Sequence, residues 1–341
     1  MPKQVKFYEY GEPEVLKLEE VDVPEPGLNE VRIKTEAIGI GTPEVWWRKN
    51  MYIEPTPLPS SLGYECAGTI EAVGANVKEF KIGDRVSTYP AHSQAEYSPY
   101  GESVIMPVVS VASYPDNLTP VQAAAYWQNY MTGYFAIVEI AHLVAGQTIV
   151  ITAGSGGTGI AAIQIAKRLG AKIITTTRSS VKKQALLDAG ADYVVVTNDE
   201  DLVARVNEIT KGRGADVIYD SVGGEQFQTL GSITAINGWL ILYGVTAGAD
   251  VVIPILDAIK RSIKISAYGL FSYIGHPVLG IPRDERGVQR AITFINDGMA
   301  KGHFVPQVDC VFPFIEVVEA FRYLEEGKHV GKIVLEISDR K

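Results

Sequence analysis

Hydrophobic positions change their spacing near residue 120 of this 341-residue chain. Before that point, short apolar runs such as 31–35 alternate with polar residues and are interrupted by proline and glycine, which is typical of short strands joined by turns. Thr119 and Pro120 then mark a helix start, because threonine is a good N-cap and proline suits the first helical turn. The chain therefore changes from a strand-rich half to a half in which helices and strands alternate.

The alternating half predicts a parallel sheet. Its expected strands are 149–151, 172–177, 193–197, 216–220 and 239–243, and its expected helices are 160–169, 181–189 and 202–210. Apolar strands connected by amphipathic helices form parallel sheets with right-handed crossovers, so this half predicts an α/β, doubly wound Rossmann sheet. The last segments, two helices and a strand, are expected to pack back on the N-terminal half (288–298, 314–326 and 331–337).

Length and composition limit the class of protein. At about 150 residues per domain, two domains are expected, one of residues 1–125 completed by 270–341 and one of residues 126–269. The hydrophobic fraction of 46% excludes a disordered chain. A formal charge of -9 disfavours nucleic acid as a partner, and the lack of an apolar stretch of about 18 residues disfavours a membrane. Two cysteines and a polar N-terminus unlike a signal peptide predict a cytoplasmic protein.

The strongest functional signal is the run Gly154-Ser155-Gly156-Gly157-Thr158-Gly159. It fits the G-x-G-x-x-G pattern and lies between an expected strand and an expected helix. Glycines there permit a tight turn, and the free N–H groups at the helix start then face a pyrophosphate. The run therefore predicts a dinucleotide site, with a glycine-rich turn that binds nothing as the alternative.

The end of the second expected strand indicates which dinucleotide binds. NAD sites carry a carboxylate about twenty residues after the glycines, whereas this strand is followed by Arg178, Ser179 and Lys182 without an acid. A guanidinium, a hydroxyl and an ammonium suit a 2′-phosphate dianion. These residues therefore predict NADPH, with a solvated helix start as the alternative interpretation of the cations.

Metal ligands are few in this sequence. The five histidines are isolated and Cys66 and Cys310 lie far apart, so a structural zinc site with four ligands is not expected. A catalytic zinc would need Glu65, Cys66 and a distant histidine, which is the less favoured interpretation. We therefore expect no metal site, with each histidine on the surface or in a packing role.

Two parts of the chain resemble a known family. The run Gly63-Tyr64-Glu65-Cys66-Ala67-Gly68, with Gly74 and 80–86, resembles the catalytic domain of the medium-chain dehydrogenase/reductases, and 153–159 with 220–224 resembles their cofactor domain. Within that superfamily the chain is similar to the zinc-independent quinone oxidoreductases and enoyl reductases, the group that includes zeta-crystallin. Zinc alcohol dehydrogenases have a histidine where this chain has Tyr64, and the four-cysteine lobe of those enzymes is missing.

This resemblance implies a GroES-like, β-rich catalytic domain and a Rossmann domain with NADPH in the cleft between them. It implies nicotinamide contacts from Thr132, from the run Tyr243-Gly244-Val245 and from Phe271. It also implies that Ser221 and Val222 contribute to the cofactor site.

The expected absence of a metal favours one kind of reduction. A ketone would lack its usual Lewis acid, whereas hydride addition to a conjugated carbonyl needs only donors for the enolate and a weak acid. Tyr52 is the leading proton donor, because it matches the donor tyrosine of mitochondrial enoyl thioester reductases, and Tyr64 is the second candidate. Other candidates for the substrate pocket are Trp46, Trp47 and the segment 89–97, with packing and an ordinary surface loop as the alternatives.

The sequence therefore predicts an NADPH-dependent reductase that acts on an apolar α,β-unsaturated carbonyl compound or a quinone, without a metal. Two alternatives stay open: an alcohol/ketone oxidoreductase of the same superfamily, and a non-catalytic dinucleotide-binding protein of the crystallin kind. A homodimer is expected, because the family pairs cofactor domains edge to edge and 262–268 is a candidate edge strand.

Overall fold

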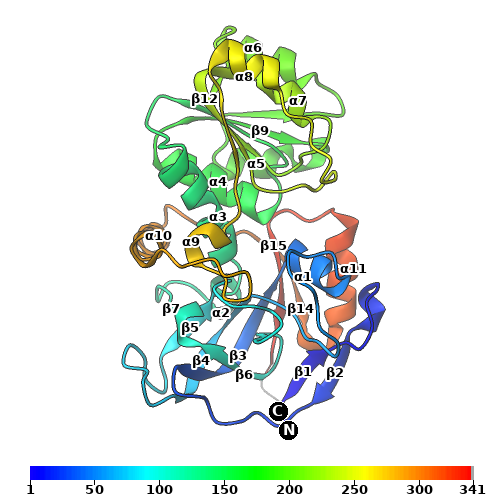
Figure 1. Cartoon of the computed structure of the whole chain (residues 1–341), viewed down its shortest axis with the longest axis vertical. Coiled ribbons are helices and arrows are strands. Elements are labelled where there is room, and N and C mark those ends of the chain that lie inside the picture. The colour runs from blue at the N-terminus through cyan, green and yellow to red at the C-terminus, as the bar shows by residue number, and fades with distance from the viewer. Residues whose placement is uncertain (339–341) are drawn as a thin grey trace. The chain divides into compact units, whose positions relative to one another are not determined.

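The computed structural model describes residues 1–338 and divides the chain into two compact units (Figure 1). The first unit comprises Met1–Gln128 and the chain from Phe271 onward, and the second comprises Asn129–Leu270. No helix among the described residues is long and apolar enough to cross a membrane.

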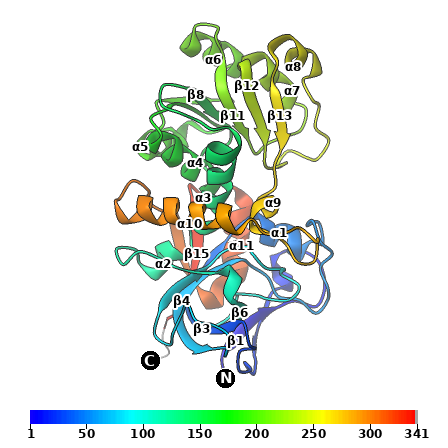
Figure 2. The ribbon, with the colours of Figure 1, turned by 60° about the vertical axis from the view of Figure 1, so that its left-hand side comes forward.

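The second unit contains one six-stranded sheet in which all neighbouring strands are parallel. Its strands, in spatial order, are β10 (Tyr193–Val196), β9 (Lys172–Thr177), β8 (Thr148–Ile151), β11 (Ala215–Asp220), β12 (Thr234–Leu242) and β13 (Lys264–Ala267). Its helices are α3 (Trp127–Tyr134), which begins two residues before the unit, α4 (Gly157–Arg168), α5 (Lys183–Ala189), α6 (Leu202–Thr210), α7 (Phe227–Leu230) and α8 (Ile255–Arg261). Helices lie on both faces of this sheet (Figure 2), which confirms the predicted doubly wound arrangement.

The first unit is rich in strands. A seven-stranded sheet contains β14 (Val308–Pro313), β15 (Lys332–Glu336), β3 (Glu30–Ile40), β4 (Glu65–Val73), β5 (Arg85–Thr88), β7 (Val111–Ser113) and β6 (Ser103–Pro107), and a separate pair consists of β1 (Lys3–Lys6) and β2 (Lys17–Glu20). Its helices are α1 (Thr42–Arg48), α2 (Pro120–Ala123), α9 (Phe271–Ile274), α10 (Glu285–Ala300) and α11 (Val317–Glu326). Because β15 pairs antiparallel with β3, the C-terminal segment joins the sheet of the N-terminal half.

Local sequence explains several element boundaries. Thr119 caps α2 through a capping box with Gln122, in which each residue accepts a hydrogen bond from the other's backbone N–H. Gly190 ends α5 with φ 117°, a conformation that glycine adopts without a steric penalty. The four residues of β8 are all buried, as expected for a strand covered on both faces.

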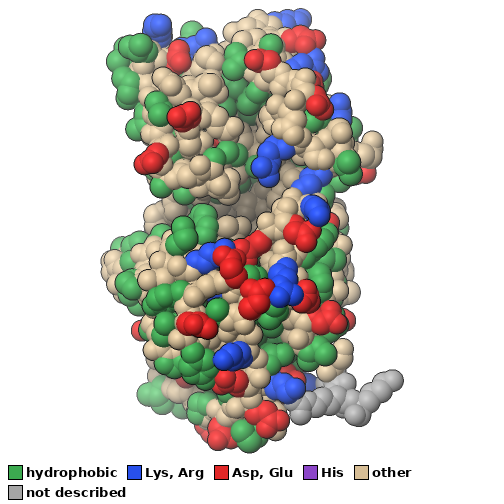
Figure 3. Space-filling view, turned by 90° about the vertical axis from the view of Figure 1, so that its right-hand side faces the viewer, with side chains coloured by type: hydrophobic (Ala, Val, Ile, Leu, Met, Phe, Trp, Pro, Cys, Tyr) green, Lys and Arg blue, Asp and Glu red, His purple; other side chains and the backbone are tan. Residues whose placement is uncertain are grey.

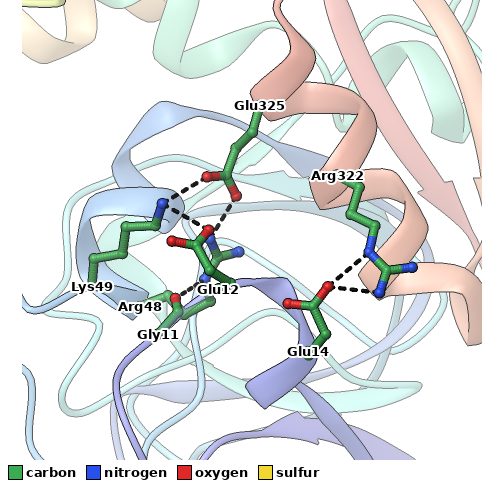
Figure 4. A network of polar contacts seen from close by, with 7 residues as sticks. All are labelled: Gly11, Glu12, Glu14, Arg48, Lys49, Arg322 and Glu325. Atoms are coloured by element: carbon green, nitrogen blue, oxygen red, sulfur yellow. Dashed lines mark hydrogen bonds and ion pairs between the residues drawn. The ribbon is translucent and has the colours of Figure 1, made fainter.

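A network of ion pairs ties α1 to α11 (Figure 4). The buried Arg48 binds Glu325 at 2.6 Å and donates from Nε to the carbonyl oxygen of Gly11 at 2.8 Å. Lys49 binds the second oxygen of Glu325 at 2.8 Å. Elsewhere on the surface, acidic and basic side chains are interspersed on the face seen in Figure 3, which presents no field of one sign.

Candidate functional site

Four neighbouring parallel strands of the second unit bring most of the predicted cofactor residues to one sheet edge. The carboxyl ends of β8, β9, β11 and β12 lie side by side, because these strands are adjacent and parallel. The residues that follow these strands are Gly154–Gly159 after β8, Arg178, Ser179 and Lys182 after β9, Ser221 and Val222 after β11, and Tyr243, Gly244 and Val245 after β12. Open α/β sheets bind their ligands at this edge.

The glycines of the run after β8 have different steric surroundings. A Cβ on Gly154 would lie 1.9 Å from Oγ1 of Thr175, and a Cβ on Gly159 would lie 2.6 Å from the backbone of Gly154, so both positions need glycine for close packing. A Cβ on Gly156 would meet only the carbonyl oxygen of Ala153, at 3.9 Å. Gly156 is also the N-cap of α4, and no side chain caps that helix start. The turn therefore leaves space and backbone N–H groups for a phosphate.

The end of β9 presents cations and hydroxyls to solvent. Thr177 accepts a hydrogen bond at Oγ1 from the backbone N–H of Ser179 at 3.2 Å, which fixes the turn after the strand. Arg178 is exposed and Lys182 is half-buried. No carboxylate occurs between Thr177 and Lys183. The side chains present fit a phosphorylated ribose better than one with two free hydroxyls.

A buried polar contact joins β8 and β11 at this edge of the sheet. Thr152 donates to Oδ1 of Asp220 at 2.6 Å, and the N–H of Gly223 donates to the other carboxyl oxygen at 2.8 Å. Next to it, the rings of Tyr219 and Tyr243 stack at 3.9 Å. These contacts join the carboxyl ends of β8, β11 and β12 at this edge of the sheet. The predicted contact Thr132 lies on α3 of the same unit, whereas Phe271 begins α9 of the first unit.

Both catalytic candidates lie in the first unit and face one another. The ring centroids of Tyr52 and Tyr64 are 6.3 Å apart, and Tyr64 lies 6.1 Å from Phe271 and 5.2 Å from His92. Tyr64 is fully buried and Tyr52 is half-buried. Burial raises the pKa of both phenols well above the ordinary value, so both hydroxyls stay protonated near neutral pH and can act as hydrogen-bond donors.

The segment 89–97 is not the ordinary surface loop that sequence reasoning took as the default. His92, Ser93 and Gln94 are each no more than 2% exposed, because the segment packs under the tyrosine pair. Trp47 is also fully buried, and its indole N–H donates to the carbonyl oxygen of Ser61 at 2.8 Å. Its observed role is therefore packing.

A buried carboxylate that sequence reasoning missed supports this region. Glu54 accepts hydrogen bonds from Oγ of Ser93 at 3.0 and 2.9 Å and lies 3.5 Å from Nε2 of His276. Nδ1 of His276 accepts the N–H of Leu279, so the ring proton is on Nε2 and faces the carboxylate. The only local signal was an acidic residue within a proline-rich stretch, because the partners of Glu54 lie far along the chain.

The candidate zinc ligands Glu65 and Cys66 lie in surroundings that a metal does not need to complete. Glu65 is 1% exposed and binds Nζ of Lys332 at 2.7 Å, while its other oxygen accepts the N–H of Gln128 at 2.9 Å. Burial raises the pKa of the Cys66 thiol to about 12, which keeps the thiol protonated near neutral pH. Within residues 1–338, no group of three or more His, Cys, Asp or Glu side chains is placed to hold a metal ion.

A second buried acid lies beside this ion pair. Glu44 is 1% exposed, and a Cβ on Gly41 would lie 3.2 Å from Nζ of Lys332 and 3.3 Å from Oε2 of Glu44. Burial raises the pKa of Glu44 to about 7, against the opposing effect of Lys332. One buried ammonium is therefore paired with Glu65 and lies close to the second buried carboxyl group, Glu44.

Comparison with known proteins agrees with this architecture. The family model of the alcohol dehydrogenase GroES-like domain matches residues 27–136, and that of the zinc-binding dehydrogenase matches residues 157–277. The quinone oxidoreductase of Pseudomonas aeruginosa is 35% identical over 279 residues, which cover 81% of this chain and 84% of that protein.

Solved structures extend the similarity to almost the whole chain. The quinone oxidoreductase of Escherichia coli complexed with NADPH has a TM-score of 0.86 and 29% identity, and the match covers 98% of this chain and 99% of that one. The CurK enoyl reductase has a TM-score of 0.86 and 25% identity, covering 99% of each chain. This chain is therefore an oxidoreductase that belongs to the medium-chain dehydrogenase/reductases, in the group of the quinone oxidoreductases and enoyl reductases.

Proposed function

We propose that this oxidoreductase uses NADPH to reduce an α,β-unsaturated carbonyl compound or a quinone without a metal ion. The observation that carries the proposal is the pair of neighbouring tyrosines Tyr52 and Tyr64 in the first unit. Tyr64 stands where zinc alcohol dehydrogenases have a histidine, and its ring lies 6.3 Å from that of Tyr52. Both phenols have raised pKa values, so their hydroxyls would donate hydrogen bonds to the substrate oxygen in place of a Lewis acid.

The sheet edge of the second unit offers groups that fit NADPH, which supplies a hydride when bound. The N–H groups at the start of α4 would bind its pyrophosphate, next to the space beside Gly156. Arg178, Ser179 and Lys182 would bind its 2′-phosphate. The similar enzyme from Escherichia coli was solved with NADPH, which supports this choice of dinucleotide.

The tyrosine pair accounts for the remaining chemistry. Hydride addition to the β-carbon of a conjugated carbonyl leaves negative charge on its oxygen, and a hydroxyl donor stabilises that charge. The α-carbon then needs a proton, which Tyr52 supplies as the more exposed of the two phenols. Similarity to both a quinone oxidoreductase and an enoyl reductase supports a conjugated acceptor rather than a simple ketone.

The experiment that tests the proposal is an NADPH-oxidation screen over enones, enals, unsaturated thioesters, quinones and simple ketones, with metal analysis of the same preparation. The proposal expects turnover of conjugated acceptors that a chelator leaves unchanged. Stoichiometric zinc together with turnover of simple ketones or alcohols alone would support the alcohol/ketone alternative. Tight NADPH binding without turnover of any acceptor would support a non-catalytic role.

The cations after β9 should set the preference for the phosphorylated cofactor. Arg178→Ala combined with Lys182→Ala should weaken NADPH binding by about tenfold and leave NADH binding unchanged, because the 2′-phosphate loses its cationic partners. Isothermal titration with each dinucleotide measures the effect, and Lys211→Ala, an exposed lysine at the end of α6, is the control. Equal affinities of the unaltered protein for NADPH and NADH would refute the assignment.

We further propose that the protein forms a homodimer through the edge strand β13. This strand ends the six-stranded sheet (Figure 2), and α8 beside it exposes Ile255, Leu256 and Ile259 at 55, 71 and 73%. Analytical ultracentrifugation should give twice the mass of one chain. Leu256→Glu with Ile259→Glu should give a monomer, whereas Val181→Glu, at a position 89% exposed elsewhere in the unit, should not. A monomeric unaltered protein would contradict the proposal.

A further inference from the structure

The side chain of Gln94 is held in one orientation beneath the tyrosine pair. The backbone N–H of Gly63 donates to Oε1 of Gln94 at 2.7 Å. A backbone N–H can only donate, so the amide oxygen is fixed at Gly63 and the NH₂ group is directed elsewhere. Nε2 of Gln94 and the hydroxyl of Tyr64 are both buried, and neither makes a hydrogen bond to any of the described residues. Two unsatisfied buried polar groups therefore lie in one cluster.

The surroundings of Tyr64 indicate which of these groups donates a hydrogen bond and which accepts it. Burial is the main cause of the raised pKa of Tyr64, and an interaction with the Gln94 amide acts against it, as expected if the amide donates to the Tyr64 oxygen. The interaction between the phenols raises the pKa of Tyr64 and lowers that of Tyr52, although burial keeps the latter high. The geometry points the same way: an amide NH₂ that donates to the Tyr64 oxygen leaves the Tyr64 proton for another acceptor, and the ring of Tyr52 lies 6.3 Å away.

Other titratable groups around Tyr64 do not replace Gln94 as the donor. Nε2 of His92 faces the carbonyl oxygen of Gly63 at 3.3 Å, which places its proton there and leaves Nδ1 as an acceptor. Burial lowers the pKa of His92 to about 4, so the ring is neutral at pH 7. Glu54 and His276 face each other at 3.5 Å, and Ser93 donates to the same carboxylate.

We propose that Gln94 is a positioning residue that sets a one-way chain of hydrogen-bond donors, from Gln94 to Tyr64 to Tyr52, and so aims the Tyr52 proton at the substrate. This inference rests on the proposed reductase function. Catalytic hydrogen bonds are often long without substrate and shorten when it binds, so we expect both contacts to tighten in the complex.

The proton transfer balances within this series of hydrogen-bond donors. The enolate α-carbon takes the proton of Tyr52, and the electron pair of the broken O–H bond stays on the Tyr52 oxygen as a phenolate. The hydroxyl of Tyr64 stabilises that phenolate by donating to it, while Gln94 keeps the Tyr64 oxygen supplied with a donor. Water then returns a proton to Tyr52, which is half-buried rather than fully enclosed.

The substitution Gln94→Glu tests the direction of these hydrogen bonds, because it hardly changes the size of the side chain. The new carboxylate still accepts the N–H of Gly63, but its second oxygen accepts from Tyr64 and draws that proton away from Tyr52. We expect kcat for an enone to fall by about tenfold at pH 8 with little change in KM. The loss should shrink as pH falls, because a protonated carboxyl group donates as the amide does. Gln94→Met is the matched control and should lower kcat equally at every pH.

Crystal structures with NADPH give a second readout that needs no turnover. The unaltered protein should have Nε2 of Gln94 bonded to the Tyr64 oxygen and the two phenols bonded to each other, and Gln94→Glu should break the second contact. If Gln94→Glu leaves kcat unchanged, or lowers it independently of pH as Gln94→Met does, the proposed series of hydrogen bonds is wrong. The proposed reductase function would still stand in that case. An unaltered protein that reduces no conjugated acceptor overturns the proposed function and the inference together.

Discussion

Replacing Lys332 with methionine should destabilise the first unit by about 3–5 kcal/mol at pH 8. The substitution keeps the volume of the side chain but removes the ammonium that lies 2.7 Å from Glu65 and beside Glu44. The buried Glu65 then loses its ion-pair partner and the buried Glu44 loses a nearby cation, and an unpaired buried charge is costly. Urea unfolding measures the change. Lys301→Met is the control, because the pair of Lys301 with Asp297 is exposed and worth less than about 1 kcal/mol.

The raised pKa of Glu44 gives this loss a pH dependence of known sign. A carboxyl group whose pKa rises on folding, here from 4.5 to about 7, costs stability when ionised, and the cost grows as pH rises from 4.5 to 7. In the folded protein Glu44 is mostly protonated at pH 5 and mostly ionised at pH 8, so the interaction that it loses with the Lys332 ammonium is larger at pH 8. The destabilisation by Lys332→Met should therefore be smaller at pH 5 than at pH 8. A defect that stays constant or grows at acid pH would contradict the assignment of Glu44 to this cluster.

Local patterns predicted the second unit well. The helix at 202–210 and the strand at 172–177 have the predicted bounds, because each is delimited by clear changes in periodicity. Most other boundaries differ by one or two residues, and two differ by three or more. Helix α4 begins at Gly157 rather than at residue 160. Gly159 packs against the backbone of Gly154, so the last three residues of the glycine run form the first helical turn. Strand β12 begins at Thr234, five residues before the predicted start, and includes Asn237 with φ 58°.

The site was predictable where its residues are neighbours in sequence. The glycine run and the cations after β9 are local patterns, so a strand and a turn suffice to place them. The contacts of Glu54 with His276, of Gln94 with Gly63 and of Lys332 with Glu65 join segments that are distant along the chain. No periodicity reports such pairs, because tertiary packing alone decides which polar groups become buried together. The same reason made 89–97 look like an ordinary surface loop.

Tyr52→Phe should lower kcat for an enone by about 10²–10⁴-fold, because the variant loses the group that donates the proton and keeps the ring that packs against Trp47 and Tyr64. Binding of NADPH should not change, since Tyr52 lies in the first unit and the predicted phosphate contacts lie in the second. Stopped-flow and steady-state kinetics measure kcat, and fluorescence titration measures the affinity for NADPH. Tyr97→Phe is the control, because that phenol donates to Glu30 at 2.7 Å rather than to Tyr52 or Tyr64.

The choice of acceptor separates proton donation by Tyr52 from simple packing. Protonating the α-carbon of an enolate is slow without a positioned acid, whereas the oxygens of a reduced quinone take protons from water rapidly. The loss in Tyr52→Phe should therefore be large for enones and no more than about tenfold for quinones, where only one hydrogen bond to the developing charge is lost. Equal losses for both acceptors would indicate a packing defect. An unchanged enone rate would remove Tyr52 as the acid and leave the proton to Tyr64 or to water.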